Sequence, residues 1–155
     1  MKKSFILFLV TVLFSYNACN KEKDYVLYHS FENQSWYRFN KLQFEIPLEN
    51  SGRACDIYFF VRHKTDYEFD DLDFNMIMTT SSGEERIKEY HFIIKDRTGN
   101  FTGRCEKDTC IASIPLKKGI RFTKKGILKI EIENLVPRLE TRGILGAGIR
   151  LHPHG

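Results

Sequence analysis

The cysteines are the residues with the clearest chemistry in this sequence. Cys19 stands where an apolar run ends and the charged stretch NKEKD begins, a position at which a thiol can receive a lipid. Cys105 and Cys110 enclose the short segment CEKDTC. In an oxidising compartment they either close a loop between neighbouring strands or remain free thiols. Cys55 lies beside an apolar run, where we expect it to pack as a small hydrophobe.

The histidines raise the question of a metal site. His152 and His154 are two positions apart, so on a strand they would point to the same side, and His29, His63 or His91 could complete a ligand set. An HPHG terminus is more typical of a frayed tail, and no acidic residue or cysteine stands beside it at ligand spacing. We therefore expect no metal and no other cofactor apart from a covalent lipid on Cys19.

Catalytic motifs give no support for an enzyme. The sequence contains neither G-x-S-x-G nor H-E-x-x-H. The paired acids Asp70-Asp71 and Glu84-Glu85 fall in expected loops, where solvated charge is the common explanation. The four residues between Cys105 and Cys110 also differ from the two of thioredoxin-like redox motifs. We predict a protein that is not an enzyme.

Residues 1–18 have the pattern of an export signal. Lys2 and Lys3 precede the apolar run from Phe5 to Phe14, which is shorter than the roughly 20 residues of a membrane-spanning helix. Ordinary signal peptidase prefers small residues one and three positions before its cut, which Tyr16 disfavours. YNAC is a loose match to the site cut before a lipidated cysteine. We favour lipidation of Cys19 over a secreted thiol, with residues 19–24 as a charged tether.

Composition indicates one ordinary globular domain. The 155 residues are 42% apolar and 28% charged, with a formal net charge of +4. Without residues 1–18, which contain two lysines and no acids, 22 basic residues face 20 acidic ones. This balance, with both signs interspersed, gives no reason to expect a nucleic-acid partner.

Apolar residues alternate with polar ones from Tyr25 onward, the pattern of half-buried strands. KLQFEIPL and ILKIEIE show it most clearly, whereas Ile57–Val61 is apolar throughout and predicts a central strand covered on both faces. LDFNMIM and EYHFIIK are expected to form a hairpin through TSSGEE. Short strands without a strong helix predict a single all-β domain over residues 25–155, an antiparallel β-sandwich of jelly-roll type.

Two aromatic residues stand apart from this alternation. Trp36 and Tyr37 lie in the polar stretch ENQSWYRFN, where they either pack in the core or form an exposed contact surface. If they are exposed, we expect them to act with the loop residues Arg62, Asp66 and Tyr67.

Several landmarks occur in the order found in a known family. They are the leader with its cysteine, DYVLYHSFENQSW, FNKLQFEIPL, IYFFVRHKTDYEFDDL, KDRTGNFTG and GILGAGIRL. Together they resemble the gliding-motility lipoproteins of Bacteroidota called GldH. The chain departs from that pattern at Asp70-Asp71 and in CEKDTC. The resemblance implies an outer-membrane lipoprotein and a non-enzymatic accessory component of a gliding and protein-secretion apparatus, which contacts envelope proteins.

A second function remains open, that of a glycan-binding lipoprotein in a nutrient-uptake system. A row of exposed aromatic rings on one sheet face would favour it, whereas a broad apolar patch would favour a protein partner. The tether leaves the orientation open, because Lys21-Glu22 begins a surface-export pattern that Lys23 interrupts. The domain is thus expected on the outer membrane, facing either the periplasm or the outside.

Overall fold

The computed structural model describes residues 24–49 and 52–154, and these residues form strands with one short 3-10 turn. The signal segment and Cys19 lie outside the described residues. Within them, no helix is long and apolar enough to cross a membrane. The elements in chain order are β1 (Tyr25–Ser30), η1 (Glu32–Gln34), β2 (Ser35–Tyr37), β3 (Leu42–Leu48), β4 (Ala54–Lys64), β5 (Asp71–Thr79), β6 (Glu85–Ile93), β7 (Arg104–Glu106), β8 (Thr109–Arg121), β9 (Gly126–Asn134), β10 (Glu140–Arg142) and β11 (Ile144–Pro153).

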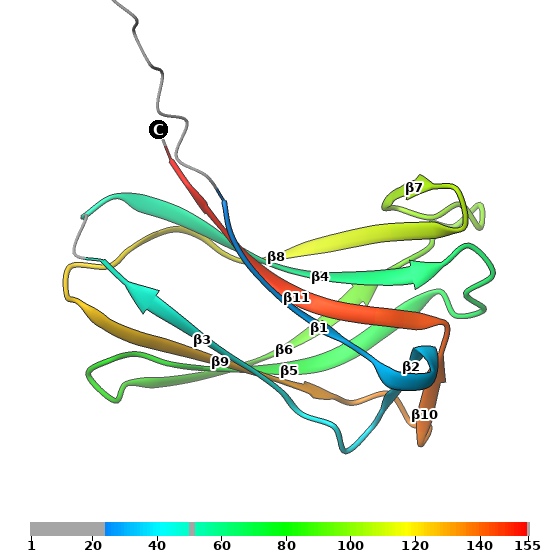
Figure 1. The fold of residues 1–155 in the computed structure, drawn as a ribbon, viewed down its shortest axis with the longest axis horizontal. Coiled ribbons are helices and arrows are strands. Elements are labelled where there is room, and N and C mark those ends of the chain that lie inside the picture. The colour runs from blue at the N-terminus through cyan, green and yellow to red at the C-terminus, as the bar shows by residue number, and fades with distance from the viewer. Residues whose placement is uncertain (1–23, 50–51, 155) are drawn as a thin grey trace, which may run out of the picture.

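Two antiparallel sheets face each other as the layers of a sandwich (Figure 1). One sheet has the order β1-β11-β4-β8-β7 and the other β3-β9-β5-β6. The long strands pair as one hairpin rolled up from the β5–β6 turn, with β5 on β6, β4 on β8, β3 on β9 and β1 on β11. Every connection in this series crosses between the sheets except the β5–β6 turn. This is jelly-roll topology, so the predicted all-β sandwich is confirmed.

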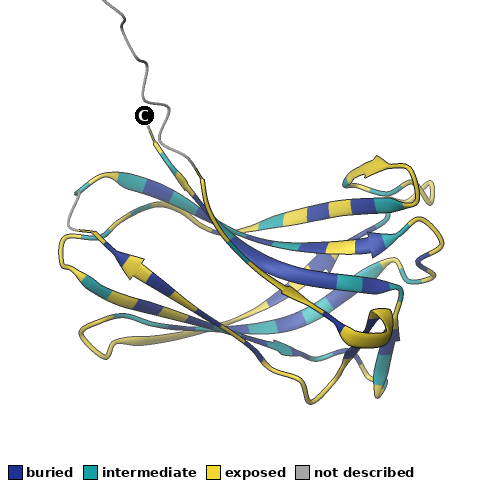
Figure 2. Ribbon diagram, in the orientation of Figure 1, coloured by how far each residue is buried: buried dark blue, intermediate teal, exposed yellow. Residues whose placement is uncertain are grey.

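Alternating burial along the strands produces the core (Figure 2). Leu42, Phe44, Ile46 and Leu48 of β3 are buried, and the residues between them are exposed. β5 and β9 repeat the pattern. Rings meet between the layers, with 4.7 Å between the ring centroids of Phe59 and Phe74. Each fully buried large side chain stabilises the fold by roughly 1.5–3 kcal/mol, so the core supplies most of the stability.

The expectation that Ile57–Val61 is covered on both faces is wrong. Ile57, Phe59 and Val61 point into the core and are fully buried, but Tyr58 and Phe60 point outward and are only half-buried. No further layer of the described residues covers them. Their apolar character is explained by neighbours on the same outer face, where the rings of Phe60 and Tyr28 stack with 6.0 Å between centroids.

Glycines of β11 make room for these outward rings. A Cβ on Gly148 would collide with the ring of Phe60 and with the carbonyl oxygen of Leu27, and one on Gly146 would collide with the ring of Tyr28. The GAG within GILGAGIRL therefore forms a shallow trough in the outer face of the five-stranded sheet. The rings of two neighbouring strands fill that trough.

The expected hairpin is confirmed. β5 and β6 pair along their whole lengths, from Asp71 opposite Ile93 to Thr79 opposite Glu85. Gly83 takes a positive φ in the turn, where its amide donates to the carbonyl oxygen of Thr80. At one end of the sandwich, a small sheet of β2 and β10 closes the core (Figure 1).

Candidate functional site

Trp36 is part of the core, and its proposed place in a contact surface is wrong. The side chain is fully buried, and its Nε1 donates a hydrogen bond to the carbonyl oxygen of Asn40 at 2.8 Å. The indole stacks on Phe31 with 5.4 Å between ring centroids. Because β2 is short and lies across the end of the sandwich, Trp36 seals the core there while Tyr37, the next residue, points out.

Tyr67 is also buried, which corrects its predicted role in an exposed surface. It lies under the turn into β11, where its Cδ2 would be 3.3 Å from a Cβ placed on Gly143. Gly143 has a φ of +84°, which favours glycine. The Tyr67 hydroxyl has no hydrogen-bond partner, and burial raises the pKa of Tyr67. This residue packs and is not available to a partner.

The other three residues predicted for a contact surface are exposed, but they do not form one patch. Tyr37 is 43% exposed on β2, opposite Glu140 of β10. Asp66 lies at the same end of the domain, after β4. Arg62 lies on the outer face of the five-stranded sheet, opposite Gly146 and Ile111. Tyr37 and Asp66 thus lie at the end of the sandwich, whereas Arg62 points outward from the five-stranded sheet.

A polar cavity of about 410 Å³ lies at this end, beside Asp66. Two neighbours in its wall, Asn33 and Gln34, have positive φ values of 53° and 54°. Backbone bonds hold the wall together, since the Gly143 amide donates to the Gln34 carbonyl and the Lys64 amide donates to the Gly143 carbonyl, each at 2.9 Å. The lining residues are Asn33, Gln34, Ser35, Lys64, Asp66, Glu68, Glu140, Arg142 and Gly143.

The charges around this cavity are mixed. Glu140 accepts a hydrogen bond from Arg142 Nε at 3.2 Å. The Ser35 hydroxyl, and next the Arg142 guanidinium, lower the pKa of Glu140. An ionised carboxylate of this kind is suited to binding polar groups and poorly suited to donating a proton. Among the described residues, no group of three or more histidine, cysteine, aspartate or glutamate side chains is arranged to hold a metal ion.

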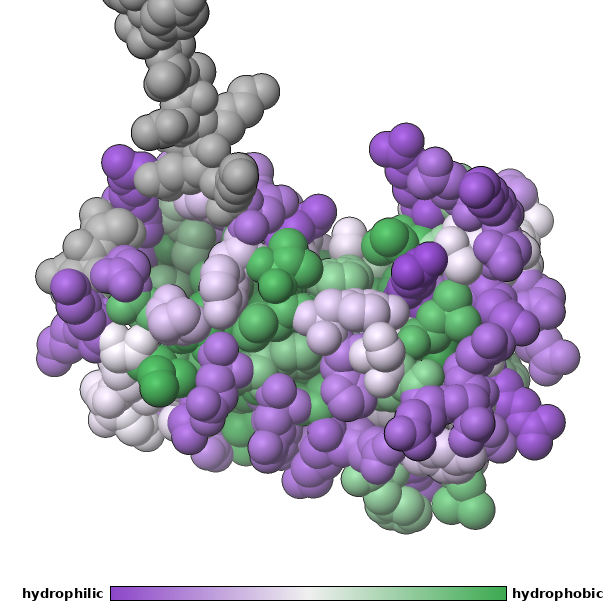
Figure 3. Space-filling model, viewed as in Figure 1, coloured by the Kyte–Doolittle hydropathy of each residue, from purple (hydrophilic) through white to green (hydrophobic). Residues whose placement is uncertain are grey.

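An exposed apolar tip projects next to the cavity. It consists of Tyr37, Phe39 and Leu139, which are 43%, 79% and 71% exposed. The Arg38 amide donates to the Leu139 carbonyl oxygen at 3.0 Å, which holds the β2–β3 turn against the β9–β10 loop. Figure 3 shows apolar side chains protruding at the lower right, below these loops. We call these three residues the distal tip, because β1 begins at the other end of the sandwich (Figure 1).

Sequence reasoning missed Phe39 and Leu139. The signal was present, since Phe39 stands between Arg38 and Asn40, and Leu139 follows Pro137 and Arg138 outside any alternating run. Single apolar residues in polar loops are common, however, and carry little information before the fold places two loops together. Because the β2–β3 and β9–β10 loops are adjacent in the fold, these two residues belong to the same exposed apolar tip.

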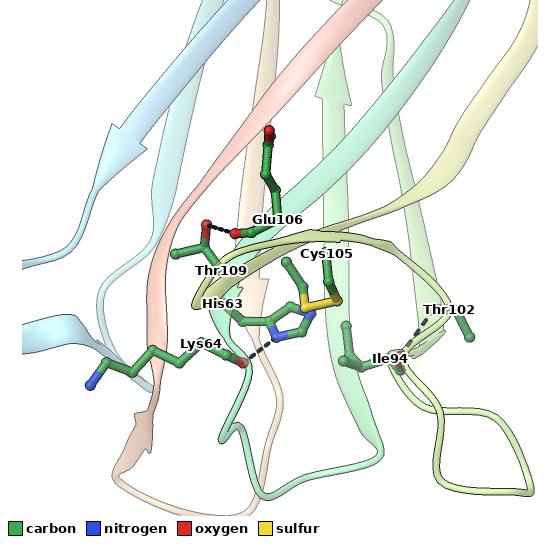
Figure 4. The surroundings of a disulfide bond; sticks show 8 residues. His63, Lys64, Ile94, Thr102, Cys105, Glu106 and Thr109 are labelled. Carbon is green, nitrogen blue, oxygen red and sulfur yellow. Dashed lines mark hydrogen bonds between the residues drawn. A yellow bond between two sulfur atoms is a disulfide. The ribbon is translucent and has the colours of Figure 1, made fainter.

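A disulfide joins Cys105 of β7 to Cys110 of β8 (Figure 4). The two residues stand directly opposite each other in the ladder, and His63 of β4 stands opposite Cys110 on its other side. His63 is fully buried, and its Nδ1 donates to the Lys64 carbonyl oxygen at 2.8 Å. Burial lowers the pKa of His63, so the ring is neutral near pH 7. This cluster fastens a short edge strand to the sheet.

Cys55 is a free, buried thiol of the described residues, in line with the expected packing. Burial raises the pKa of this thiol, which disfavours the reactive thiolate. Cys19, predicted to carry the lipid, lies outside the described residues.

The C-terminal histidines are held by acids that sequence spacing did not reveal. His152 Nδ1 lies 2.6 Å from Asp24 Oδ1, and His154 Nε2 lies 2.8 Å from Asp56 Oδ1. The His154 amide also donates to the Ala54 carbonyl oxygen at 2.9 Å. The expectation of a frayed tail is therefore wrong for residues up to 154. Each of these histidines pairs with a separate carboxylate, so the two are not gathered into one site.

The exposed aromatic residues are not arranged as a platform for sugars. On the outer face of the five-stranded sheet, Tyr28 and Phe60 stack on one another, and the Arg150 guanidinium lies 5.0 Å from the Tyr58 ring centroid. Phe39, which is 79% exposed, and Tyr37, which is as exposed as Tyr28, are instead at the distal tip. A row of exposed rings on one sheet face was expected for glycan binding, and an apolar patch for a protein partner. The apolar tip fits the second expectation better than the first.

Fold and surfaces together define a small jelly-roll domain that presents exposed apolar side chains on loops and at one sheet edge. The family described as GldH lipoprotein matches residues 24–151, and the chain belongs to this family. As a member of a lipoprotein family, it is a membrane-associated protein of the cell envelope.

Two relatives extend the likeness over nearly the whole chain. Gliding motility lipoprotein GldH of Flavobacterium johnsoniae is 23% identical over 158 residues, which cover 97% of this chain and 96% of that protein. A protein named gliding motility lipoprotein GldH homolog, from Christiangramia forsetii, is 21% identical over 154 residues, which cover 95% and 93%. No solved structure shows a significant match.

Proposed function

We propose that this chain is an outer-membrane lipoprotein and a non-enzymatic accessory component of a gliding-motility or protein-secretion apparatus. A lipid on Cys19 holds the domain at the membrane, and the domain acts by binding other envelope proteins. The observation that carries the proposal is the family match over residues 24–151, together with two relatives named for gliding motility that align over almost their full length.

The surfaces of the domain support action by binding. The distal tip exposes Phe39 and Leu139 on two loops joined by a backbone hydrogen bond, and burying such side chains is the main favourable contribution in most protein association. The titratable groups with shifted pKa values have structural causes. Burial explains the shifted pKa values of His63, Tyr67 and Cys55, and hydrogen bonds or ion pairs explain those of the half-buried acids Glu131 and Glu140.

The test is complementation of a deletion strain with full-length variants. Phe39→Ser with Leu139→Ser removes the apolar tip, and Ile87→Ser, on a residue 65% exposed on β6, is the matched surface control. Crosslinked envelopes are then purified on the tagged protein and analysed by mass spectrometry. We expect the tip variant to lose motility or secretion components that wild type and the Ile87 variant retain, with equal amounts of folded protein in all three.

The lipid is tested separately with Cys19→Ala. We expect loss of palmitate incorporation and release of the protein from the membrane fraction. Equal labelling and fractionation of the variant and wild type would contradict the anchor. If wild type instead recovers only components of glycan uptake, the glycan-binding alternative replaces the proposed function.

A further inference from the structure

The β1 edge of the five-stranded sheet differs from the other sheet edges of the described residues. Its sequence YVLYHS contains no lysine, arginine, aspartate or glutamate and no proline. Tyr25, Val26 and Tyr28 are 40%, 50% and 43% exposed. By contrast, β3 contains Pro47, β6 carries alternating charges, and β7 is three residues long and fastened by a disulfide. Natural proteins usually block edge strands by such means, and β1 has none of them.

The direction of the unpaired backbone groups on β1 follows from one hydrogen bond. The Phe31 amide donates to the Leu145 carbonyl oxygen at 3.0 Å, so this pair lies in a hydrogen-bonded position of the β1–β11 ladder. Such positions alternate along an antiparallel strand. Leu27 and His29 therefore bond to β11, whereas the amides and carbonyls of Val26, Tyr28 and Ser30 point to the open side.

An apolar cavity of about 360 Å³ opens beside the same edge. It lies between β1 and β3, the edge strands of the two sheets on this side, where Figure 3 shows apolar side chains at the surface. Tyr25 stands opposite Leu151, so both lie on the inner face of the sheet. The apolar lining includes Tyr25, Ile46, Leu48, Cys55, Phe122 and Leu151.

We propose that the open edge of β1 binds an extended segment of a partner protein, which adds a strand to the five-stranded sheet. Main-chain hydrogen bonds form with Val26, Tyr28 and Ser30. Alternate side chains of the segment are large and apolar, so that one of them fills the cavity beside Tyr25. Strand addition of this kind gains affinity from the backbone and selectivity from pockets for alternate side chains. The inference rests on the proposed function and names the kind of segment that the partner supplies.

Two other occupants fit the surface less well. Cys19 precedes Tyr25 by six residues, a reach of at most about 21 Å, so its acyl chains could arrive at the cavity. Hydrocarbon cannot bond the amides of Val26 and Tyr28. A second copy pairing through its own β1 could bond them, but its Leu27 packs against its own core and its Tyr25 lines its own cavity, so neither side chain fills the cavity of the first copy.

The direct test uses isotope-labelled, full-length protein in detergent micelles. The probe is a capped peptide of about eight residues that alternates isoleucine and threonine, with a lysine at each end. A control peptide has the same side chains and N-methylated alternate amides. We expect the first peptide to slow amide hydrogen exchange at Val26, Tyr28 and Ser30 by about tenfold or more, with Leu27 and His29 unchanged. Equal effects of both peptides, or no slowing, would overturn strand addition.

Variants of the edge sharpen the test. Val26→Pro removes an amide that faces the open side, and Val26→Lys keeps the amide but adds a charge to the edge. Both should weaken peptide binding at least tenfold, whereas Ile87→Lys on the β6 edge should not change it. Urea unfolding of each variant identifies any that fail to fold. If folded Val26 variants bind as wild type does, the proposal is wrong.

Cys55 reports on the competing occupants because its thiol lines the cavity. If Cys19→Ala makes Cys55 react faster with a small methanethiosulfonate in the absence of peptide, the acyl chains occupy the cavity and the proposal fails. A dimeric mass that Val26→Lys abolishes would assign the edge to a second copy, which also overturns it. If tip and Cys19 variants lose their envelope partners while β1 never responds to peptide, the proposed function stands and this inference falls.

Discussion

The outer faces of the two sheets differ in what covers them. On the five-stranded sheet, the rings of Tyr28 and Phe60 lie over the glycine trough of β11 and are partly buried without a further layer. On the four-stranded sheet, the outer face carries charged rows, in which Lys41 pairs with Glu131 and Glu133 and Lys129 pairs with Glu45. Ring packing thus stabilises the outer face of the five-stranded sheet. The outer face of the four-stranded sheet carries solvated ion pairs instead.

This difference predicts where substitutions are tolerated. The ring-covered face should respond to changes of volume, because the rings lie against the glycines of β11 and leave no room there for an added Cβ. The charged face should respond to salt and pH, because its contacts are exposed ion pairs.

The largest effect is expected from Gly148→Val. The added side chain collides with the Phe60 ring and the β1 backbone, which should lower the free energy of unfolding by about 3 kcal/mol. Asn75→Val, at an outward position on the central strand β5 of the other sheet, is the control and should change it by less than about 0.5 kcal/mol. Urea unfolding of both variants measures the difference. Equal stabilities would mean that the trough is not packed as described.

Phe60→Ala should have the next largest effect. Removing a half-buried ring that stacks on Tyr28 should destabilise the fold by about 2 kcal/mol. Ile87→Ala, which truncates a 65% exposed side chain on the four-stranded face, should cost less than about 0.5 kcal/mol. Thermal unfolding of the pair compares the two faces, and a larger loss for Ile87 would reverse the comparison.

A smaller, salt-dependent effect is expected for Lys41→Ala. Lys41 Nζ lies 3.2 Å from Glu131 Oε1 and also contacts Glu133, and these carboxylates raise the pKa of Lys41. Exposed pairs of this kind contribute little and are screened by salt. The variant should be slightly less stable at low ionic strength and equal to wild type in about 1 M salt. A loss that persists in high salt would indicate packing by the lysine stem.

The smallest effect concerns pH and His91, whose Nδ1 lies 2.6 Å from Asp73 Oδ1 on the four-stranded face. The hydrogen bond to Asp73 raises the pKa of His91, so the folded state holds this proton more tightly than the unfolded chain does. Its stabilising contribution is complete below the unfolded pKa of about 6.5 and is lost as pH rises through the folded pKa. Stability of His91→Asn should fall less than that of wild type between about pH 6 and pH 8. Identical pH profiles would show that the pair does not contribute.

Much of the fold was predictable because alternation is a local property of the chain. Leu42–Leu48 and Leu128–Ile132 read directly as half-buried strands, and the β5–β6 hairpin followed from its turn residues. Ile57–Val61 misled because periodicity cannot distinguish a second covering layer from large side chains that cover one another. The glycines of β11 that accommodate those rings lie far away in sequence.

The burial of the aromatic residues and the position of the distal tip were less predictable. Trp36 and Tyr37 are neighbours, and a strand must point them in opposite directions, but only the register of β2 against β10 decides which one seals the core. Phe39 and Leu139 belong to one tip only because the fold places the β2–β3 and β9–β10 loops next to each other. The acids that pair with His152 and His154 are Asp24 and Asp56. They are too far away in the sequence for any motif spacing to indicate the pairs.

The sequence by itself determined the strand pattern, the family and the predicted lipid site, because these depend on neighbouring residues and on the order of landmarks. Only the tertiary structure decided which aromatic residues are buried, that β1 is an unblocked edge, and that an apolar cavity opens beside it. Those properties depend on which strand ends up beside which. In a jelly roll the closing strand β11 returns to pair with β1, so the edge that remains open is decided by contacts across the whole length of the chain.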